Sequence, residues 1–393
     1  MAELPHAEWT ARPGLARLVD ALGHGNLRWV GGAVRDTLLG SPVQDIDAAT
    51  PLTPDGVIER LDGAGIRAIP TGIDHGTVTA LVEGGNVEIT TLRKDVSTDG
   101  RRATVAFASE WQDDAARRDF TINALYADPT TGEIFDYFGG VDDLAAGRVR
   151  FIGDARQRIR EDYLRILRYF RFHARFGDTP DAEAEAACAE LAPSLKGLSR
   201  ERVGWELIGL LALASPAPTI ARMRQLGVLQ VILPEAGSRE VDKLADVVAA
   251  ERVSRVPADP VRRLAALLPP VPAVAESAAA RLRLSRSQRH RLSCAAAREV
   301  GDGRNARTLA WRVGIDCATD RLLLTGGDIA PLAGWTVPEM PLKGGEIVAR
   351  GVGAGPEVAR ILRNVEARWV AEGFPDRARV EAILAEELER RAG

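Results

Sequence analysis

The stretch VGGAVRDTLLGSPVQDIDAAT, residues 30–50, decides the fold of this chain. Its Gly31–Gly32 pair follows a short apolar run and precedes a helical stretch that contains Arg35. Such a junction presents free backbone N–H groups and a helix N-terminus, which suit phosphate. A Gly-Gly pair before a helix is also typical of an ordinary turn, so this junction alone does not establish a phosphate site.

Two aspartates, Asp45 and Asp47, end the same stretch. On a strand, residues i and i+2 point to one face, so both carboxylates are expected at one spot. Their repulsion favours a cation, and Mg²⁺ bound by carboxylates and substrate phosphates is the expected one. A solvated loop or helix cap is the alternative, and the preceding Gly-Gly turn argues against it.

A third carboxylate, Glu88 in NVEITTLR, is a candidate on a neighbouring strand, although a surface glutamate on an edge strand fits nearly as well. We therefore predict Asp45, Asp47 and Glu88 as catalytic residues, with Asp45 and Asp47 as the metal ligands.

The sequence changes in character near residue 150. Residues 1–140 mix β-type runs with helical stretches, whereas helical periodicity continues from about residue 150 to the end. We therefore expect an α+β fold, in which a head with a small mixed sheet precedes an all-α remainder.

Composition limits the alternatives. The chain has 393 residues and a formal net charge of −4, which argues against a generally basic nucleic-acid coat but allows local basic patches. No signal peptide and no membrane-spanning run are expected. The three cysteines lie far apart without a CxxC pair, so neither a disulfide framework nor a zinc site is expected, and a reducing cytoplasm fits.

The segment EDYLRILRYFRF, residues 161–172, has helical periodicity and three arginines spaced three apart, Arg165, Arg168 and Arg171. On one helix, Asp162 and Arg165 are (i, i+3) neighbours. Arg168 and Arg171 are free to hold phosphate or to orient Asp162. An intrahelical salt bridge on a solvated face is the alternative.

The Asp162–Arg165 pair suits particular bases, because aspartate offers acceptors and arginine offers donors. Cytosine and adenine present an amino donor beside a ring-nitrogen acceptor and match this pair. Uracil and guanine present the opposite order, and each unpaired polar group in a closed pocket costs about 1–3 kcal/mol. The pair therefore predicts acceptance of C and A and rejection of U and G.

Taken in order, these segments resemble a known family. The resemblance is to the bacterial class (class II) of CCA-adding tRNA nucleotidyltransferases, in the poly(A) polymerase family of the polymerase-β-type nucleotidyltransferase superfamily. It covers about residues 28–175 and rests on GGAVRD…QDIDAAT, GIDHGTVTALV, RRDFTINALY and EDYLRILRYFRF. Weaker similarity continues through residues 198–207 and 351–365.

The resemblance implies a nucleotidyltransferase head followed by an all-α neck, body and tail. The expected bounds are residues 1–145 for the catalytic head, 146–200 for the neck that recognises the base, 201–300 for the body and 301–393 for the tRNA-binding tail. It also implies Mg²⁺-dependent, template-independent addition of C, C and A to the 3′ end of tRNA from CTP and ATP, with pyrophosphate release. We expect a cytoplasmic enzyme with tRNA as its partner, no membrane association and no protein partner.

By motif position, the resemblance also implies roles for individual residues. Asp119 would accept a hydrogen bond from a ribose 2′-OH, Arg118 would hold phosphate, and the EDxxR element would recognise the base. The implied nucleotide-binding residues are Gly31, Gly32, Arg35, Arg117, Arg118, Asp119, Glu161, Asp162, Arg165, Arg168 and Arg171.

Three alternatives stay open: a bacterial poly(A) polymerase, a partial enzyme that adds only CC or only A, and a non-enzymatic RNA-binding protein, which the intact Asp pair disfavours. Residues 93–114 are polar and contain Asp99–Gly100, so we expect a mobile loop there. In the family that this chain resembles, a loop at this place helps the pocket readjust from C to A. Its presence favours full CCA addition.

Overall fold

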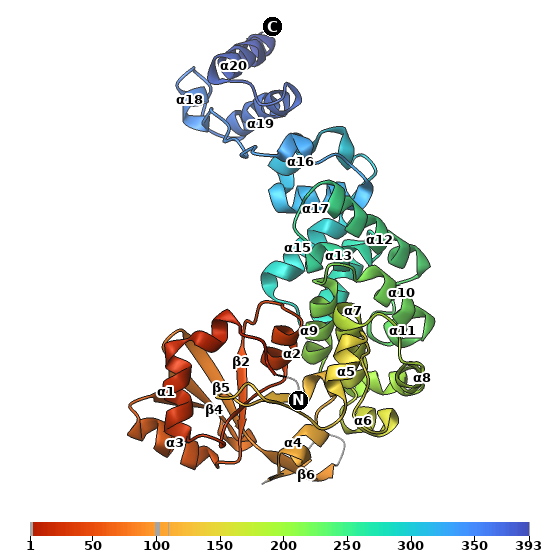
Figure 1. The fold of residues 1–393 in the computed structure, drawn as a ribbon. Helices are drawn as coiled ribbons and strands as arrows, with labels where there is room; N and C mark the ends of the chain where they lie inside the picture. The colour runs from red at the N-terminus through yellow and green to blue at the C-terminus, as the bar shows by residue number, and fades with distance from the viewer. Residues whose placement is uncertain (1–2, 99–102, 109, 393) are drawn as a thin grey trace. The chain divides into compact units, whose positions relative to one another are not determined.

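The computed structural model describes residues 3–98, 103–108 and 110–392. These residues fall into two units, Met1–Ile232 and Leu233–Gly393, and each is described by itself (Figure 1). The four-part division into head, neck, body and tail stays a prediction.

The first unit is built on a seven-stranded sheet with the order β3-β4-β5-β2-β1-β8-β9. Strands β2 and β5 run parallel, and the other neighbouring pairs are antiparallel. The strands are β1 (Arg28–Val30), β2 (Ile46–Thr50), β3 (Arg67–Gly72), β4 (Thr77–Val82), β5 (Gly85–Thr91), β8 (Leu125–Ala127) and β9 (Ile134–Asp136).

Short helices cover this sheet, as Figure 1 shows. Helices α1 (Pro13–Leu22) and α3 (Pro54–Gly63) pack against each other and against β4, while α2 (Gly32–Leu38) packs against β1, β2 and β8. Gly31 joins β1 to α2 with a φ of 66°, a left-handed conformation that favours glycine. The turn therefore places the start of α2 next to the central strands.

We expected a mobile loop at residues 93–114, and this expectation is wrong for most of the segment. Strands β6 (Arg93–Thr98) and β7 (Ala103–Phe107) pair antiparallel as a separate two-stranded ribbon, and α4 (Trp111–Ala116) follows. Cross-strand hydrogen bonds satisfy the backbone of this polar segment, so it needs no apolar face of its own. The Asp99–Gly100 dipeptide lies outside the described residues.

Helices make up the rest of the first unit. They are α5 (Gly140–Ala145), α6 (Ala155–Glu161), α7 (Arg165–Phe176), α8 (Ala182–Leu191), α9 (Arg200–Leu211), α10 (Ala217–Gln225) and α11 (Val228–Ile232). Helix α7 buries Ile166, Leu167, Tyr169, Phe170 and Phe172 and packs against α9.

The single helix that we expected across Asp162 and Arg165 is interrupted. Helix α6 ends at Glu161, Asp162 adopts an extended conformation, and α7 begins at Arg165. The Asp162 side chain accepts a hydrogen bond from the backbone N–H of Leu164 at 3.1 Å, which forms an Asx turn just before α7. Asp162 and Arg165 therefore belong to a junction between two helices.

The described residues of the second unit form helices and no strand. The helices are α12 (Ser238–Val253), α13 (Pro260–Ala266), α14 (Pro272–Arg281), α15 (Arg286–Ala296), α16 (Ala306–Val313), α17 (Ile315–Thr325), α18 (Gly344–Val348), α19 (Pro356–Ala371) and α20 (Arg377–Ala392). The predicted fold class, a mixed α+β head followed by helices, is confirmed.

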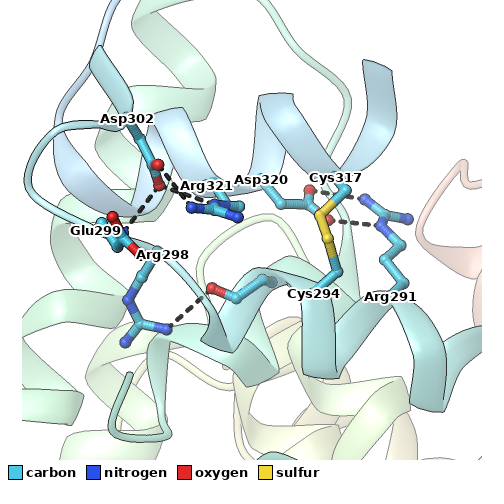
Figure 2. Close-up of a disulfide and its surroundings, with 9 residues drawn as sticks. Arg291, Cys294, Arg298, Glu299, Asp302, Cys317, Asp320 and Arg321 are labelled. Carbon is cyan, nitrogen blue, oxygen red and sulfur yellow. Dashed lines mark hydrogen bonds and ion pairs between the residues drawn. A yellow bond between two sulfur atoms is a disulfide. The ribbon is translucent and has the colours of Figure 1, made fainter. Parts of the chain in front are cut away.

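A disulfide bond joins Cys294 on α15 to Cys317 on α17, with 6.2 Å between the two Cα atoms (Figure 2). Our expectation of no disulfide was wrong, because the antiparallel packing of these helices brings together cysteines 23 residues apart. Arg291 forms an ion pair with the buried Asp320 beside the bond (Figure 2). The third cysteine, Cys188, is free and buried.

Among the described residues, no helix is both long enough and apolar enough to cross a bilayer.

Candidate active site

A cavity of about 690 Å³ in the first unit brings together twelve of the fourteen residues predicted from the sequence. Its lining comes from the β1–α2 turn, the start of β2, the segment after α4, and α7. The lining residues are Gly31, Gly32, Arg35, Asp45, Asp47, Arg117, Arg118, Asp119, Asn123, Asp162, Arg165, Arg168, Arg171 and Phe172. Glu88 and Glu161 are the two predicted residues that do not line it.

Asp45 lies just before β2 and Asp47 is the second residue of that strand, and both line the cavity. Ile46 and Ala48 alternate with them and are buried, so the aspartates share the open face of the strand. Asp47 lies opposite Glu88 of β5 in the parallel register. Partial desolvation, and then the Glu88 carboxylate, raise the pKa of Asp47 above its usual value. The site thus gathers negative charge that a cation would neutralise.

Helix α2, which follows the β1–α2 turn, contributes Arg35, a residue that is 5% exposed. Arg35 donates from Nε to Asp36 at 2.9 Å and from Nη1 to the side-chain oxygen of Asn123, and its guanidinium lies over the ring of Phe176. Burial lowers the pKa of Arg35, although Asp36 partly offsets this. Arg35 is therefore held rigidly at the wall of the cavity.

Arg117 and Arg118 are held by one buried carboxylate that sequence reasoning missed, Asp114. Arg117 donates to Asp114 at 2.8 Å, Arg118 donates to it at 3.2 Å, and the hydroxyl of Tyr126 donates to it at 2.7 Å. Burial would raise the pKa of Asp114, but the two arginines and Tyr126 lower it overall. Asp114 therefore stays ionised and orients both arginines.

Asp119 is buried and is already engaged by protein groups. One carboxylate oxygen accepts from the N–H of Phe120 at 2.9 Å and from the side-chain amide of Asn123 at 3.0 Å, and the other accepts from Arg168 at 2.7 Å. Burial would raise the pKa of Asp119, but Arg168 and Asn123 outweigh it and lower the pKa. The Nη2 of Arg168 lies 2.6 Å from that second oxygen as well, so protein groups surround both oxygens and a donor from a ligand would have to share them.

The junction between α6 and α7 presents Asp162 and Arg165 to the cavity, but they do not pair with each other through their side chains. Asp162 accepts from Arg202 of α9 at 2.6 Å. Arg165 is bound to Glu161 at 2.7 Å and donates to the carbonyl of Arg117 at 3.0 Å. Glu161 thus supports the site from outside the cavity by fixing Arg165.

Arg168 and Arg171 complete the arginine wall. Arg171 donates to Glu206 of α9 at 2.6 Å, and Arg168 lies 3.8 Å from the same carboxylate. Phe172 lies under both guanidinium groups, with 5.2 Å from its ring centroid to Arg168 and 4.8 Å to Arg171. Glu206 and Phe172 were not predicted. The sequence did contain a signal for Phe172, because it lies four residues after Arg168 and so on the same side of the helix.

A divalent metal suits the Asp pair. Among the residues described, no group of three or more His, Cys, Asp or Glu side chains is arranged to hold an ion. Two carboxylates fit a hard cation that keeps part of its water and takes its other ligands from substrate phosphates. Burial and then the Glu88 carboxylate raise the pKa of Asp47, and Arg118 offsets this only in part.

Two family models match the chain. Residues 27–150 match the model described as "Poly A polymerase head domain", and residues 179–238 match "Probable RNA and SrmB- binding site of polymerase A".

Curated relatives extend the likeness over most of the chain. The human protein named "CCA tRNA nucleotidyltransferase 1, mitochondrial" is 38% identical over 369 residues, which cover 88% of this chain and 83% of the relative. The "CCA-adding enzyme" of Leuconostoc mesenteroides is 41% identical over 54% of this chain and 51% of its own.

Solved structures agree on the fold. The Bacillus stearothermophilus CCA-adding enzyme in complex with CTP aligns with a TM-score of 0.70 and 25% identity, over 95% of this chain and 97% of that one. The Thermotoga maritima CCA-adding enzyme complexed with tRNA aligns with a TM-score of 0.70 and 20% identity, over 96% and 93% of the two chains, and this likeness supports the fold alone.

Proposed function

Since the chain belongs to the CCA-adding tRNA nucleotidyltransferases, we propose that the cavity of its first unit binds CTP and ATP for transfer to the 3′ end of tRNA. The enzyme adds C, C and A to tRNA and releases pyrophosphate. We place the site here because Asp45 and Asp47 line the same cavity as the arginines of α7.

The arginine wall binds the triphosphate in this proposal. Arg35, Arg117 and Arg118 are fixed by Asp36 and Asp114, so their geometry is set before the nucleotide arrives. Such pre-organised guanidinium groups stabilise the charge that develops on the leaving pyrophosphate without further rearrangement. Asp119 lines the cavity and accepts the ribose 2′-OH in this proposal, sharing its oxygens with Arg168 and Asn123, which favours ribonucleotides.

Base recognition falls to Asp162 and Arg165. Arg202 holds Asp162 and Glu161 holds Arg165, so the junction before α7 offers the base an acceptor and the first residue of α7 offers it a donor. This arrangement supports the matched donor and acceptor order of C and A, even though the two residues do not share one helix. Arg168 and Arg171 support the same wall through Asp119 and Glu206.

The nucleotidyltransferase fold implies a divalent metal, and we propose that it is Mg²⁺, held by Asp45 and Asp47. When bound, such an ion neutralises the phosphates and lowers the pKa of the attacking 3′-hydroxyl. Glu88, opposite Asp47, adds to the negative potential that attracts the ion. The cytoplasmic location stays a prediction, and the disulfide removes the support that we drew from the scattered cysteines.

Incubation of tRNA that lacks its 3′ CCA with labelled CTP and ATP, separately and together, tests the function. We expect two additions with CTP alone and three with both nucleotides, in Mg²⁺ and not in chelator. A long A-tail would identify a poly(A) polymerase, and a product arrested at CC, or made only from a CC end, would identify a partial enzyme.

A further inference from the structure

Trp205 on α9 is 78% exposed and differs in its surroundings from the other six of the seven tryptophans. The other six each lie against another aromatic ring, in the pairs Trp9–Trp29, Trp111–Tyr126, Trp311–Trp369 and Trp335–Phe374. Among the described residues, no ring contact is formed by Trp205. An indole is large and mostly apolar, so leaving it in water is unfavourable unless a ligand covers it.

The position of Trp205 relates it to the cavity. Arg202, three residues earlier on the same helix, binds Asp162 at 2.6 Å, and Glu206, the next residue, binds Arg171 at 2.6 Å. Residues three apart on a helix are surface neighbours, so the indole lies beside Arg202. The side of α9 that faces the core is formed by Val203, Gly204, Leu207, Leu210 and Leu211.

Trp205 therefore lies on the solvent side of the α9 edge that contacts α7. Because Arg202 reaches Asp162 from this edge, the indole is next to the rim of the cavity at its base-recognition end. All of these contacts lie within the first unit.

The surroundings of the indole suit an unpaired nucleic-acid strand. Arg202 beside the indole is exposed and also binds Asp162, so one shared cation adjoins the open aromatic face. The exposed Glu201, one turn before Trp205, adjoins it as well. Aromatic faces combined with cations are how proteins bind single strands without reading their sequence. Residues 179–238, which match the RNA-binding family model, include this segment. The interior bases of a duplex have both faces covered by stacking, so an unpaired base offers the indole a face that the middle of a duplex does not.

We propose that Trp205 stacks on an unpaired base at the 3′ end of the tRNA and holds that end beside the cavity. The proposal rests on the proposed function, because it takes the tRNA end as the substrate. Trp205 is a binding residue for the RNA and takes no part in the chemical step. A stacked base next to Asp162 would keep the growing end in place while one nucleotide is exchanged for the next.

Three variants separate stacking from general apolar contact: Trp205→Ala, Trp205→Leu and Trp205→Phe. We expect Ala and Leu to raise the KM for tRNA about tenfold, with the KM for CTP unchanged, and Phe to stay close to wild type. Val253→Ala, which shortens another exposed apolar side chain (85% exposed) on α12, is the control and should leave both constants unchanged. Unchanged thermal unfolding would show that the variants stay folded.

Fluorescence reports the contact directly. The difference in emission between wild type and Trp205→Phe isolates Trp205 from the other six tryptophans. We expect that difference to be quenched by tRNA with an unpaired 3′ end and unaffected by the same RNA trimmed to a blunt end.

If Trp205→Ala and Trp205→Leu bind the overhanging tRNA as tightly as wild type, the inference is wrong, and a protein surface becomes the candidate partner. If both variants lose the same affinity for blunt-ended RNA, stacking on the 3′ end is also excluded. Failure of wild type to add any nucleotide to tRNA would instead overturn the proposed function, and the fluorescence comparison keeps the two failures apart.

Discussion

Arg168 of α7 donates from Nε to a carboxylate oxygen of Asp119, 2.7 Å away, and so ties the arginine helix to the segment that contains Arg117 and Arg118. The same pattern continues on either side, since Arg165 binds Glu161 and Arg171 binds Glu206. Each of these three arginines, which are spaced three residues apart on α7, therefore has its own carboxylate partner, and each partner comes from a different segment.

Asp47→Asn and Asp45→Asn should each lower nucleotide addition by about 100-fold or more, because a metal-binding carboxylate contributes several kcal/mol of charge stabilisation. Binding of tRNA, measured by filter retention, should stay near wild type. Asp55→Asn, in the exposed first turn of α3, is the matched control. Activity within roughly tenfold of wild type in either variant would place the Asp pair outside the catalytic centre.

Asp162→Ala should weaken discrimination against UTP by about tenfold, because the unfavourable contact with the uracil carbonyl disappears. Competition between labelled CTP and UTP on one tRNA measures the effect. Arg160→Ala, on the exposed side of α6, should leave selectivity unchanged. Full selectivity in Asp162→Ala would assign α6, α7 and their arginines to phosphate binding or to structure alone.

Shortening the β6–β7 ribbon between Asp95 and Ala108 should leave two C additions nearly intact and suppress the A. The base of the ribbon is connected to the nucleotide wall, since the backbone N–H of Arg93 donates to Asp114, which holds Arg117 and Arg118. Product lengths with CTP alone and with both nucleotides measure the change. Normal A addition by the shortened enzyme would mean that the ribbon has no part in the exchange.

Asp114→Asn should destabilise the first unit by about 3 kcal/mol at neutral pH, because two arginines lose the carboxylate that they share. The pKa of Asp114 is lowered in the folded state, so its contribution is complete above the unfolded-state pKa of about 4 and is lost as the pH falls through the folded value.

Urea unfolding of wild type and Asp114→Asn, from neutral pH to below about pH 4, should therefore show a difference that shrinks at the acidic end. Asp62→Asn, an exposed change on α3, should show no such trend. A gap between wild type and Asp114→Asn that stayed constant with pH would rule out the ionised carboxylate as its source.

Reduction of the Cys294–Cys317 bond should destabilise the second unit by about 3 kcal/mol, because the bond closes a loop of 23 residues that is otherwise open in the unfolded chain. Thermal unfolding with and without dithiothreitol measures this. The double variant Cys294→Ser, Cys317→Ser should be as unstable as the reduced enzyme and insensitive to the reductant. If dithiothreitol lowered the stability of wild type and of the double variant equally, the reductant would be acting somewhere other than the Cys294–Cys317 bond.

The positions of the head residues were predictable because local patterns determine them. Asp45 and Asp47 alternate with buried neighbours on one strand, and Gly31 follows from the turn that it makes. The interruption at Asp162 was missed because helical periodicity continues across it, although an aspartate before Leu164 and Arg165 is also a helix-cap signal.

Long-range contacts were the part that the sequence could not supply. Nothing in the spacing of Cys294 and Cys317 predicts their bond, since only the packing of α15 on α17 brings them together. Asp114 of α4 was overlooked in part for the same reason, because its contact with Tyr126 of β8 is long-range, whereas its contacts with Arg117 and Arg118 are local. The β6–β7 ribbon did carry a local signal in Asp99–Gly100, a frequent hairpin turn.

Arg165, Arg168 and Arg171 of α7 already have carboxylate partners within the protein. An arriving polyanion must share these arginines with the carboxylates of the protein, so it gains less from the release of loosely held counter-ions than it would in a bare cationic cavity. Unrelated polyphosphates and RNA fragments in a cell can interact with these arginines only through their charge, so their affinity for the cavity is expected to be low. The paired arginines thus make binding selective. Negative charge alone gives weak binding, and contacts with the sugar and the base determine which ligands bind tightly.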